Sequence, residues 1–148
     1  MSAVVREARR WLGTPYRHQA SARGSGTDCL GLIRGIWRAV HGREPEDVPA
    51  YSADWAEPDR IEVLHMAALR HLRPVAFERP YRPGEILLFR MRDGSIAKHL
   101  GIVGRVVPHV TFIHAYSGRG VVENALSEPW ERRVVARFDF PPASHLEA

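Results

Sequence analysis

Residues 24 to 33 read Gly24-Ser25-Gly26-Thr27-Asp28-Cys29-Leu30-Gly31-Leu32-Ile33 and contain the only cysteine of the chain. Small, turn-forming residues precede Cys29, and apolar residues with the three- and four-residue spacing of a helix follow it. These apolar residues are Leu32, Ile33, Ile36, Trp37 and Val40. The pattern predicts a helix that holds Cys29 in its first turn, on the buried face. Asp28 or Thr27 can serve as its N-cap, and Gly42 as its stop.

A thiol at the start of a helix lies in the positive end of the helix dipole, which lowers the thiol pKa and raises the thiolate fraction. We therefore interpret Cys29 as an activated nucleophile. The alternative is that Cys29 is a small buried apolar residue, as free cysteines often are. This stretch alone leaves both interpretations open.

The composition is that of an ordinary globular protein, with 148 residues, of which 45% are hydrophobic and 26% charged. It predicts one domain that spans residues 1–148. A single cysteine excludes an internal disulfide and a cysteine-based zinc site. No apolar run is long enough to span a membrane.

The formal charge of +4 favours an anionic partner, such as an acidic polymer. The 21 basic residues are scattered, without the dense or aromatic-interleaved motif of nucleic-acid binders, so we expect no specific nucleic-acid binding. Residues 1–7 lack the apolar core of a signal peptide. The chain is therefore expected to be made in the cytoplasm and carried elsewhere by another agent.

Two further helices are predicted from helical spacing, over residues 3–12 and 61–72. The first places Val4, Val5, Ala8, Trp11 and Leu12 on one face and ends at Gly13. The second begins near Pro58, has Ile61, Leu64, His65, Ala68, Leu69 and Leu72 on its stripe, and ends at Pro74. We interpret His65 as a partly buried core residue. Residues 44–58 are predicted to form an ordered surface loop.

Beyond residue 82 the pattern changes to alternation and short apolar runs, which are typical of strands. The predicted strands are 86–89, 96–103, 110–116, 121–124 and 133–140. The first is apolar on both faces, and the last sets Val134, Ala136, Phe138 and Phe140 against a more polar side. Helices followed by an antiparallel sheet predict an α+β fold.

A cysteine nucleophile needs a base, usually a histidine, and that histidine needs an orienting group. His99 and His114 fall on consecutive predicted strands, and antiparallel pairing can place both rings on one face. Gly101, on the same face as His99, leaves that surface open to a helix or a substrate. We predict His99 as the base and His114 as its orienter, and an exposed position for His109. The alternative is that both histidines are ordinary strand residues.

Five segments follow one another along nearly the whole chain. They are Thr14-Pro15-Tyr16, Asp28-Cys29-Leu30-Gly31-Leu32, Pro83-Gly84-Glu85-Ile86-Leu87-Leu88-Phe89, His99-Leu100-Gly101-Ile102 and Phe112-Ile113-His114-Ala115. In this order they resemble the NlpC-type cell-wall cysteine peptidases, which are papain-like enzymes of bacteria and phages. The resemblance implies the papain-like NlpC-type fold, with N-terminal helices packed on a C-terminal antiparallel sheet.

The resemblance also implies a Cys-His-His triad on Cys29, His99 and His114. It places Tyr16 beside the thiol and implies that Asp28 helps to bind substrate. The implied substrate is the peptide stem of peptidoglycan, commonly cut between D-glutamate and the diamino acid. No metal or other cofactor is required.

The chain departs from the bacterial housekeeping members in three places. Leu30 stands where they usually have serine, residues 18–20 stand where they tend to have paired glycines, and the stretch of residues 44–82 is long. These features, with residues 117–123, look more like the phage-tail branch, which includes gene transfer agents. That branch implies tail hub or baseplate partners and a particle that delivers the enzyme to the periplasm and cell wall. It implies neither membrane insertion nor a fixed oligomeric state.

The expected reaction is amide hydrolysis through a thioester on Cys29, with the backbone N–H of Cys29 and the Tyr16 hydroxyl as oxyanion donors. His99 is expected to hold the thiol proton in a thiolate–imidazolium pair. Acyl transfer to an amine would use the same residues and stays open. The other alternative is a catalytically silent tail component, either a structural part or a wall-binding module.

Overall fold

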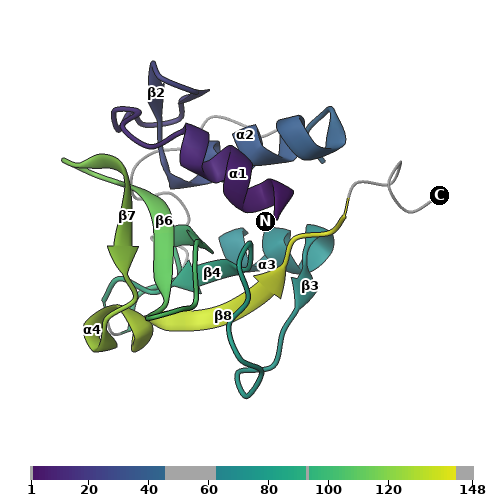
Figure 1. Cartoon of the computed structure of the whole chain (residues 1–148), viewed down its shortest axis with the longest axis vertical. Coiled ribbons are helices and arrows are strands. Elements are labelled where there is room, and N and C mark those ends of the chain that lie inside the picture. Colours follow the sequence, from purple (N-terminus) through teal and green to yellow (C-terminus); the bar gives the residue numbers. More distant parts are fainter. Residues whose placement is uncertain (1, 46–62, 93, 143–148) are drawn as a thin grey trace.

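The computed structural model describes residues 2–45, 63–92 and 94–142. Its elements follow one another as α1 (Ala3–Arg10), β1 (Ser21–Ala22), β2 (Gly26–Thr27), α2 (Cys29–His41), α3 (Val63–His71), β3 (Arg73–Pro74), β4 (Ile86–Phe89), β5 (His99–Val103), β6 (Thr111–Tyr116), β7 (Gly120–Ala125), α4 (Glu128–Glu131) and β8 (Val134–Asp139). The predicted α+β fold is confirmed. Figure 1 shows α1 and α2 together above the sheet, with α4 at its opposite side.

The main sheet has six strands in the order β3-β8-β4-β5-β6-β7, and every neighbouring pair is antiparallel. Consecutive strands β4 to β7 lie side by side, as short connections dictate, and β8 returns to the free edge of β4. The predicted strand over 96–103 begins only at His99. Sequence patterns did not predict β1, β2, β3 or α4, each of which has at most four residues.

The two N-terminal helices pack closely because α2 carries a glycine at the crossing point. A Cβ on Gly35 would come within 2.1 Å of the Trp11 ring, so only glycine admits that ring. The predicted buried face of α1 is confirmed for Val4, Val5, Ala8 and Trp11. It is wrong for Leu12, which is 42% exposed because the helix ends at Arg10 and the chain then turns.

Helix α2 begins and ends where the sequence predicts. Asp28 is its N-cap, and Gly42 ends it in the left-handed region at φ 86°. In α3, Leu64 and Ala68 are buried and His65 is half-buried, as predicted, and Leu72, which directly follows the helix, is also buried. The prediction that Leu69 belongs to the packed stripe of this helix is wrong, because Leu69 is 53% exposed. The predicted loop beyond residue 45, the start at Pro58 and Ile61 lie outside the described residues.

The sheet separates two apolar clusters. The helix-side cluster joins residues of α1, α2 and α3 to strand residues such as Leu88, Leu100 and Ile113. The other cluster lies on the opposite face, around Leu87, Phe89, Val103, Phe112 and Val134, with Trp130 of α4 against it. The chain therefore buries both faces of its central strands, which explains why 86–89 is apolar throughout.

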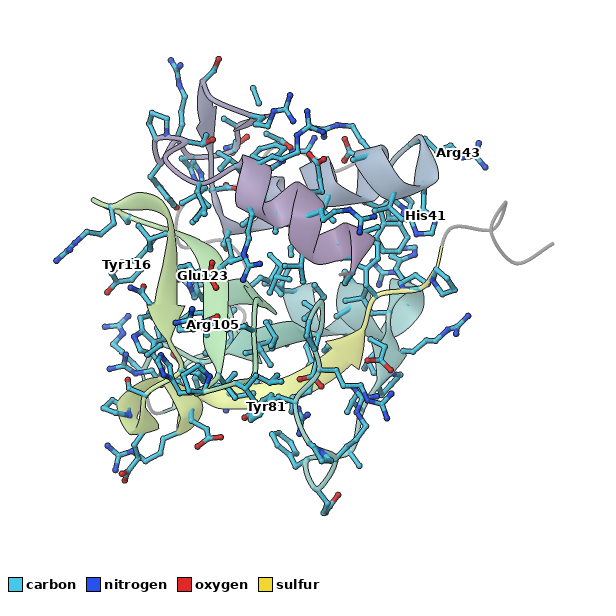
Figure 2. All side chains as sticks on the ribbon, in the orientation of Figure 1. His41, Arg43, Tyr81, Arg105, Tyr116 and Glu123 are labelled. Carbon is cyan, nitrogen blue, oxygen red and sulfur yellow. The ribbon has the colours of Figure 1, made fainter. Side chains whose placement is uncertain are left out.

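The more polar side of β8 carries a buried arginine, which the alternation did not predict. Arg137 is buried, and it donates to the buried carboxylate of Glu85 at 2.8 Å. The Arg79 guanidinium also donates to Glu85, at 3.0 Å, and to both oxygens of Asp139. The guanidinium of Arg137 lies over the Tyr81 ring, which Figure 2 shows beside β8.

Among the described helices, none combines the length and the apolar character that crossing a membrane requires.

Candidate active site

Cys29 is the first residue of α2, and its sulfur lies against the strand that carries His99. The Sγ atom donates to the backbone carbonyl of Lys98 at 3.5 Å, and the backbone N–H of Leu100 also bonds to it. These two groups flank His99 along the chain. The ladder between β5 and β6 covers only Ile102 and Val103 of β5, so the first residues of β5 lie outside it, where the thiol meets them.

The predicted lowering of the thiol pKa is wrong. Burial raises the pKa of Cys29 to about 12, and the negative charge of Asp28 adds to this effect. The backbone N–H groups of Leu30 and Leu100 act in the opposite direction but do not outweigh burial. The resting group is therefore a neutral thiol, which donates to Lys98 instead of existing as an ion pair with an imidazolium.

His99 and His114 lie together on the face opposite α1 and α2. Nε2 of His99 is 2.7 Å from Nδ1 of His114, and the rings are nearly perpendicular. Both side chains are buried. The predicted juxtaposition of the two rings on neighbouring strands is thus confirmed.

Asn124 of β7 completes this hydrogen-bonded chain, and sequence reasoning missed it. Its Oδ1 lies 2.8 Å from Nε2 of His114. A carbonyl oxygen only accepts, so Nε2 of His114 carries the proton and its Nδ1 accepts from Nε2–H of His99. Nδ1 of His99 is then the unprotonated nitrogen, available to take a proton. The signal was present, because Val122 pairs with His114 and Asn124 shares its face of β7.

Burial keeps the His99 and His114 side chains neutral. It lowers the pKa of His99 to about 3, with a contribution from His114, and it lowers the pKa of His114 to about 4. The hydrogen bond to Asn124 partly offsets the effect at His114. At neutral pH, His99 is thus a free base beside a neutral thiol.

Tyr16 lies near the thiol, as the resemblance implied. A parallel bridge with Thr27 fixes its backbone, and its side chain stays exposed enough to meet a ligand. Burial, together with the charges of Cys29 and Asp28, raises the pKa of Tyr16 to about 12. Its hydroxyl therefore keeps its proton and remains a hydrogen-bond donor.

Asp28 is buried, and backbone groups occupy its carboxylate. Oδ1 accepts from the N–H of Gly31 at 2.7 Å, which is the N-cap bond, and Oδ2 accepts from the N–H of Gln19 at 2.8 Å. Gln19 adopts a left-handed φ of 65° where the resemblance places glycines. His18 approaches Oδ2 at 3.8 Å. Asp28 therefore holds the loop before Cys29 in place.

Gly101 does not leave the surface beside His99 open to a helix or a substrate, contrary to the prediction. A Cβ there would come within 2.9 Å of the Phe112 ring and 3.3 Å of the Phe89 ring, so the space belongs to these side chains and not to a substrate. His109 is exposed, as predicted. Within residues 2–45, 63–92 and 94–142, no group of three or more His, Cys, Asp or Glu side chains could hold a metal ion.

The arrangement can support nucleophilic chemistry. It combines a thiol at a helix start, a neutral imidazole with an acceptor nitrogen, and two groups that fix the tautomer of that imidazole. A hydroxyl donor, Tyr16, lies on the exposed side. The structure places Tyr16 and Asp28 near Cys29, joins His99 to His114, and sets the Cys29 sulfur against the backbone next to His99.

No family model matches the chain. In sequence it is similar to a protein named "Murein DD-endopeptidase MepS/Murein LD-carboxypeptidase" from Escherichia coli strain K12, and to its counterpart in strain O157:H7. Each is 26% identical over 133 residues, which are 89% of this chain and 58% of theirs. The chain thus spans less than two thirds of the length of these curated relatives.

Solved structures agree in fold. The NlpC/P60 domain of the peptidoglycan hydrolase SagA matches with a TM-score of 0.61 and 21% identity, over 93% of this chain and 97% of that domain. An NlpC/P60 family protein from Bacillus cereus matches with a TM-score of 0.64 and 19% identity, over 96% of this chain and 41% of that one. In fold, the chain is therefore similar to NlpC/P60 domains.

Proposed function

We propose that the protein is a cysteine endopeptidase that hydrolyses the stem peptide of peptidoglycan. The observation that most supports this is the hydrogen-bonded chain from His99 through His114 to Asn124, which leaves Nδ1 of His99 unprotonated. The Cys29 sulfur lies against the strand that carries His99. The similarity to murein hydrolases supports the substrate class.

In the proposed reaction, substrate binding moves Sγ of Cys29 from the Lys98 carbonyl toward Nδ1 of His99. His99 takes the thiol proton as sulfur attacks the scissile carbonyl carbon. The N–H of Cys29 and the hydroxyl of Tyr16 donate to the developing oxyanion. The C–N bond then breaks, and the amine leaves with the proton from His99. Water, deprotonated by His99, hydrolyses the thioester and restores the thiol.

The proposed scissile bond is the one between D-glutamate and the diamino acid. The Escherichia coli relatives are named for two other activities, a DD-endopeptidase and an LD-carboxypeptidase. We also propose that Asp28 contributes to substrate binding, through its support of the loop that carries Tyr16 and His18.

Incubation of the protein with defined muropeptides, followed by mass analysis of the fragments, tests the proposal. We expect fragments with the new termini of the D-glutamyl bond, and none from Cys29→Ala protein of unchanged far-UV circular dichroism. A DD or LD cleavage pattern would support the peptidase activity but would identify a different scissile bond. Equal hydrolysis by Cys29→Ala protein would end the proposal.

We propose further that the enzyme is carried in a phage-like tail particle, bound to hub or baseplate proteins, and acts at the cell wall. The support is the likeness of residues 117–123 to the phage-tail branch. Detection of the chain in purified particles by mass spectrometry tests this placement. Its absence from particles whose other tail proteins are detected would refute it.

A catalytically silent wall-binding or structural component is the second candidate. The raised pKa of Cys29 and its bond to a backbone carbonyl favour it. The two candidates differ in turnover: the silent protein would sediment with purified peptidoglycan and release no fragment. Acyl transfer would instead yield a peptide joined to an added amine.

A further inference from the structure

Helix α4, between β7 and β8, brings one tryptophan onto the histidine pair. The helix has only four residues, Glu128–Glu131, and Trp130 is its inward-facing member. Figure 1 shows α4 on the side of the sheet away from α1 and α2. Sequence patterns gave no role to this residue.

The Trp130 ring contacts both members of the pair. Its centroid lies 5.2 Å from that of His114, with the rings nearly perpendicular, and 5.9 Å from that of His99, with the rings tilted by 33°. It also contacts the rings of Phe89, Phe112 and Tyr116, at 5.5, 5.1 and 5.6 Å. Trp130 thus lies at the centre of the aromatic surroundings of the pair.

Contacts on the outer side hold α4 in this position. The Tyr81 hydroxyl donates to Glu131 at 2.9 Å, and the Arg133 guanidinium lies over the Trp130 ring at 5.5 Å. Tyr81 is itself covered by Arg137, which bonds to the buried Glu85. The short helix is therefore tied to the charged cluster beneath β8, although four residues alone would not form a stable helix.

We propose that Trp130 is a positioning residue that covers the His99–His114 hydrogen bond and excludes water from it. For its effect on catalysis this inference rests on the proposed function. Trp130 has no reacting atoms, so it acts through the two imidazoles: it fixes the planes of their rings and keeps their bond in an apolar environment. A hydrogen bond in such an environment is stronger and less exposed to competition from water.

The charged and titratable groups around the pair come from several elements. They are Cys29 at the start of α2, whose sulfur bonds to the Lys98 carbonyl, Tyr116 on β6, whose ring contacts both histidines, and Arg133 beyond α4, which lies over the Trp130 ring. Asn124 on β7 is neutral and bonds directly to His114. Removal of Trp130 changes none of these charges, so its effect on the histidines is one of solvation.

The expected effect has a definite sign. Burial lowers the pKa of both histidines, so admitting water raises each pKa toward the ordinary value. At mildly acidic pH part of His99 is then protonated and cannot act as a base. A contribution to folding alone would lower stability without moving these pKa values.

NMR titration of the histidine ring signals in Trp130→Ala protein tests the inference and requires no activity. Trp37→Ala is the matched control, because Trp37 is also a half-buried tryptophan packed on histidines, at 4.8 Å from His41 and 6.2 Å from His71. We expect the pKa of His99 and His114 to rise in Trp130→Ala and to stay unchanged in Trp37→Ala. Trp130→Phe, which keeps a ring, should restore most of the wild-type values.

The activity readout is the pH profile of kcat on muropeptides. In Trp130→Ala the acid limb should move to higher pH, with roughly a tenfold loss at one pH unit below a restored pKa of about 6.5. If Trp130→Ala does not fold, Trp130→Leu should show a smaller shift of the same sign. Unchanged histidine pKa values in a folded Trp130→Ala or Trp130→Leu protein would overturn the inference. Absence of muropeptide hydrolysis by wild-type protein would refute the proposed function and leave the NMR test intact.

Discussion

The carbonyl oxygen of Asn124 fixes where the protons lie in the histidine chain. Because it accepts from Nε2–H of His114, it forces His99 to present an unprotonated Nδ1. The protein's only asparagine thus selects the tautomer that a general base requires. The sequence predicted His99 and His114 from their spacing, but it gave no reason to weigh a polar residue one strand farther on.

Asn124→Ala should lower kcat by about tenfold or more, because His114 is then free to adopt the wrong tautomer. Asn124 lies at the surface, so we expect little change in stability. Asn124→Asp is the matched variant, since a carboxylate oxygen accepts the same hydrogen bond. This variant should retain most of the activity. Steady-state kinetics on muropeptides measures both, and equal rates for Asn124→Ala and wild type would contradict this role.

At the scale of elements, the N-cap of α2 affects both stability and the thiol. Asp28→Ala removes the bond to the Gly31 N–H and should cost about 1 kcal/mol of unfolding free energy. Asp28→Asn keeps a capping oxygen but removes the charge that raises the pKa of Cys29. We expect iodoacetamide to alkylate Asp28→Asn protein faster than wild type at the same pH. Equal alkylation rates would show that the charge of Asp28 does not act on the thiol.

The buried ion pair between β8 and the start of β4 is the second element-scale feature. Arg137→Met leaves Glu85 buried with only Arg79 as its charged partner, and should cost about 3 kcal/mol in urea unfolding. Arg132→Met is the control, because the Arg132–Glu128 pair is exposed and should be worth about 0.5 kcal/mol or less. Similar costs for the two substitutions would contradict a structural role for the buried pair.

The elements that were predicted well have strong periodicity or clear caps. Helix α2 has both, with Asp28 before it and Gly42 after it, and β4 is apolar throughout. The elements that were missed are short and depend on tertiary contacts: α4 exists because Trp130 packs on the histidines and Tyr81 holds Glu131. The burial of Arg137 could not be predicted because its partner, Glu85, is 52 residues away in sequence. The thiol pKa was misjudged because the expected lowering counted only the helix dipole, although the pattern also placed Cys29 on the buried face, where desolvation raises the pKa.

At the scale of the whole molecule, burial of two neutral histidines makes stability depend on pH. The pKa of His99 is lowered to about 3 and that of His114 to about 4, whereas unfolded histidine titrates near 6.5. The unfolded chain therefore binds more protons between these values. The stability is fully present above about pH 6.5 and is lost as pH falls toward 4.

Urea unfolding at a series of pH values checks this loss. We expect a slope of up to about 1.4 kcal/mol per pH unit for each proton taken up, and a shallower slope in His114→Gln protein. The carboxyl groups of Glu44, Glu123 and Asp139, whose pKa values are lowered in the folded state, add to the loss at lower pH. A flat profile between pH 6.5 and 4 would contradict neutral burial of the pair.

The proposed reaction requires the imidazole of His99 to take the proton from the sulfur of Cys29. The most direct test is the rate of muropeptide hydrolysis by His99→Ala protein beside that of His109→Ala, which removes an exposed histidine of the β5–β6 loop. Both proteins are checked for wild-type circular dichroism. We expect a loss of about a hundredfold or more for His99→Ala and none for His109→Ala. Hydrolysis by folded His99→Ala at the wild-type rate would contradict this requirement.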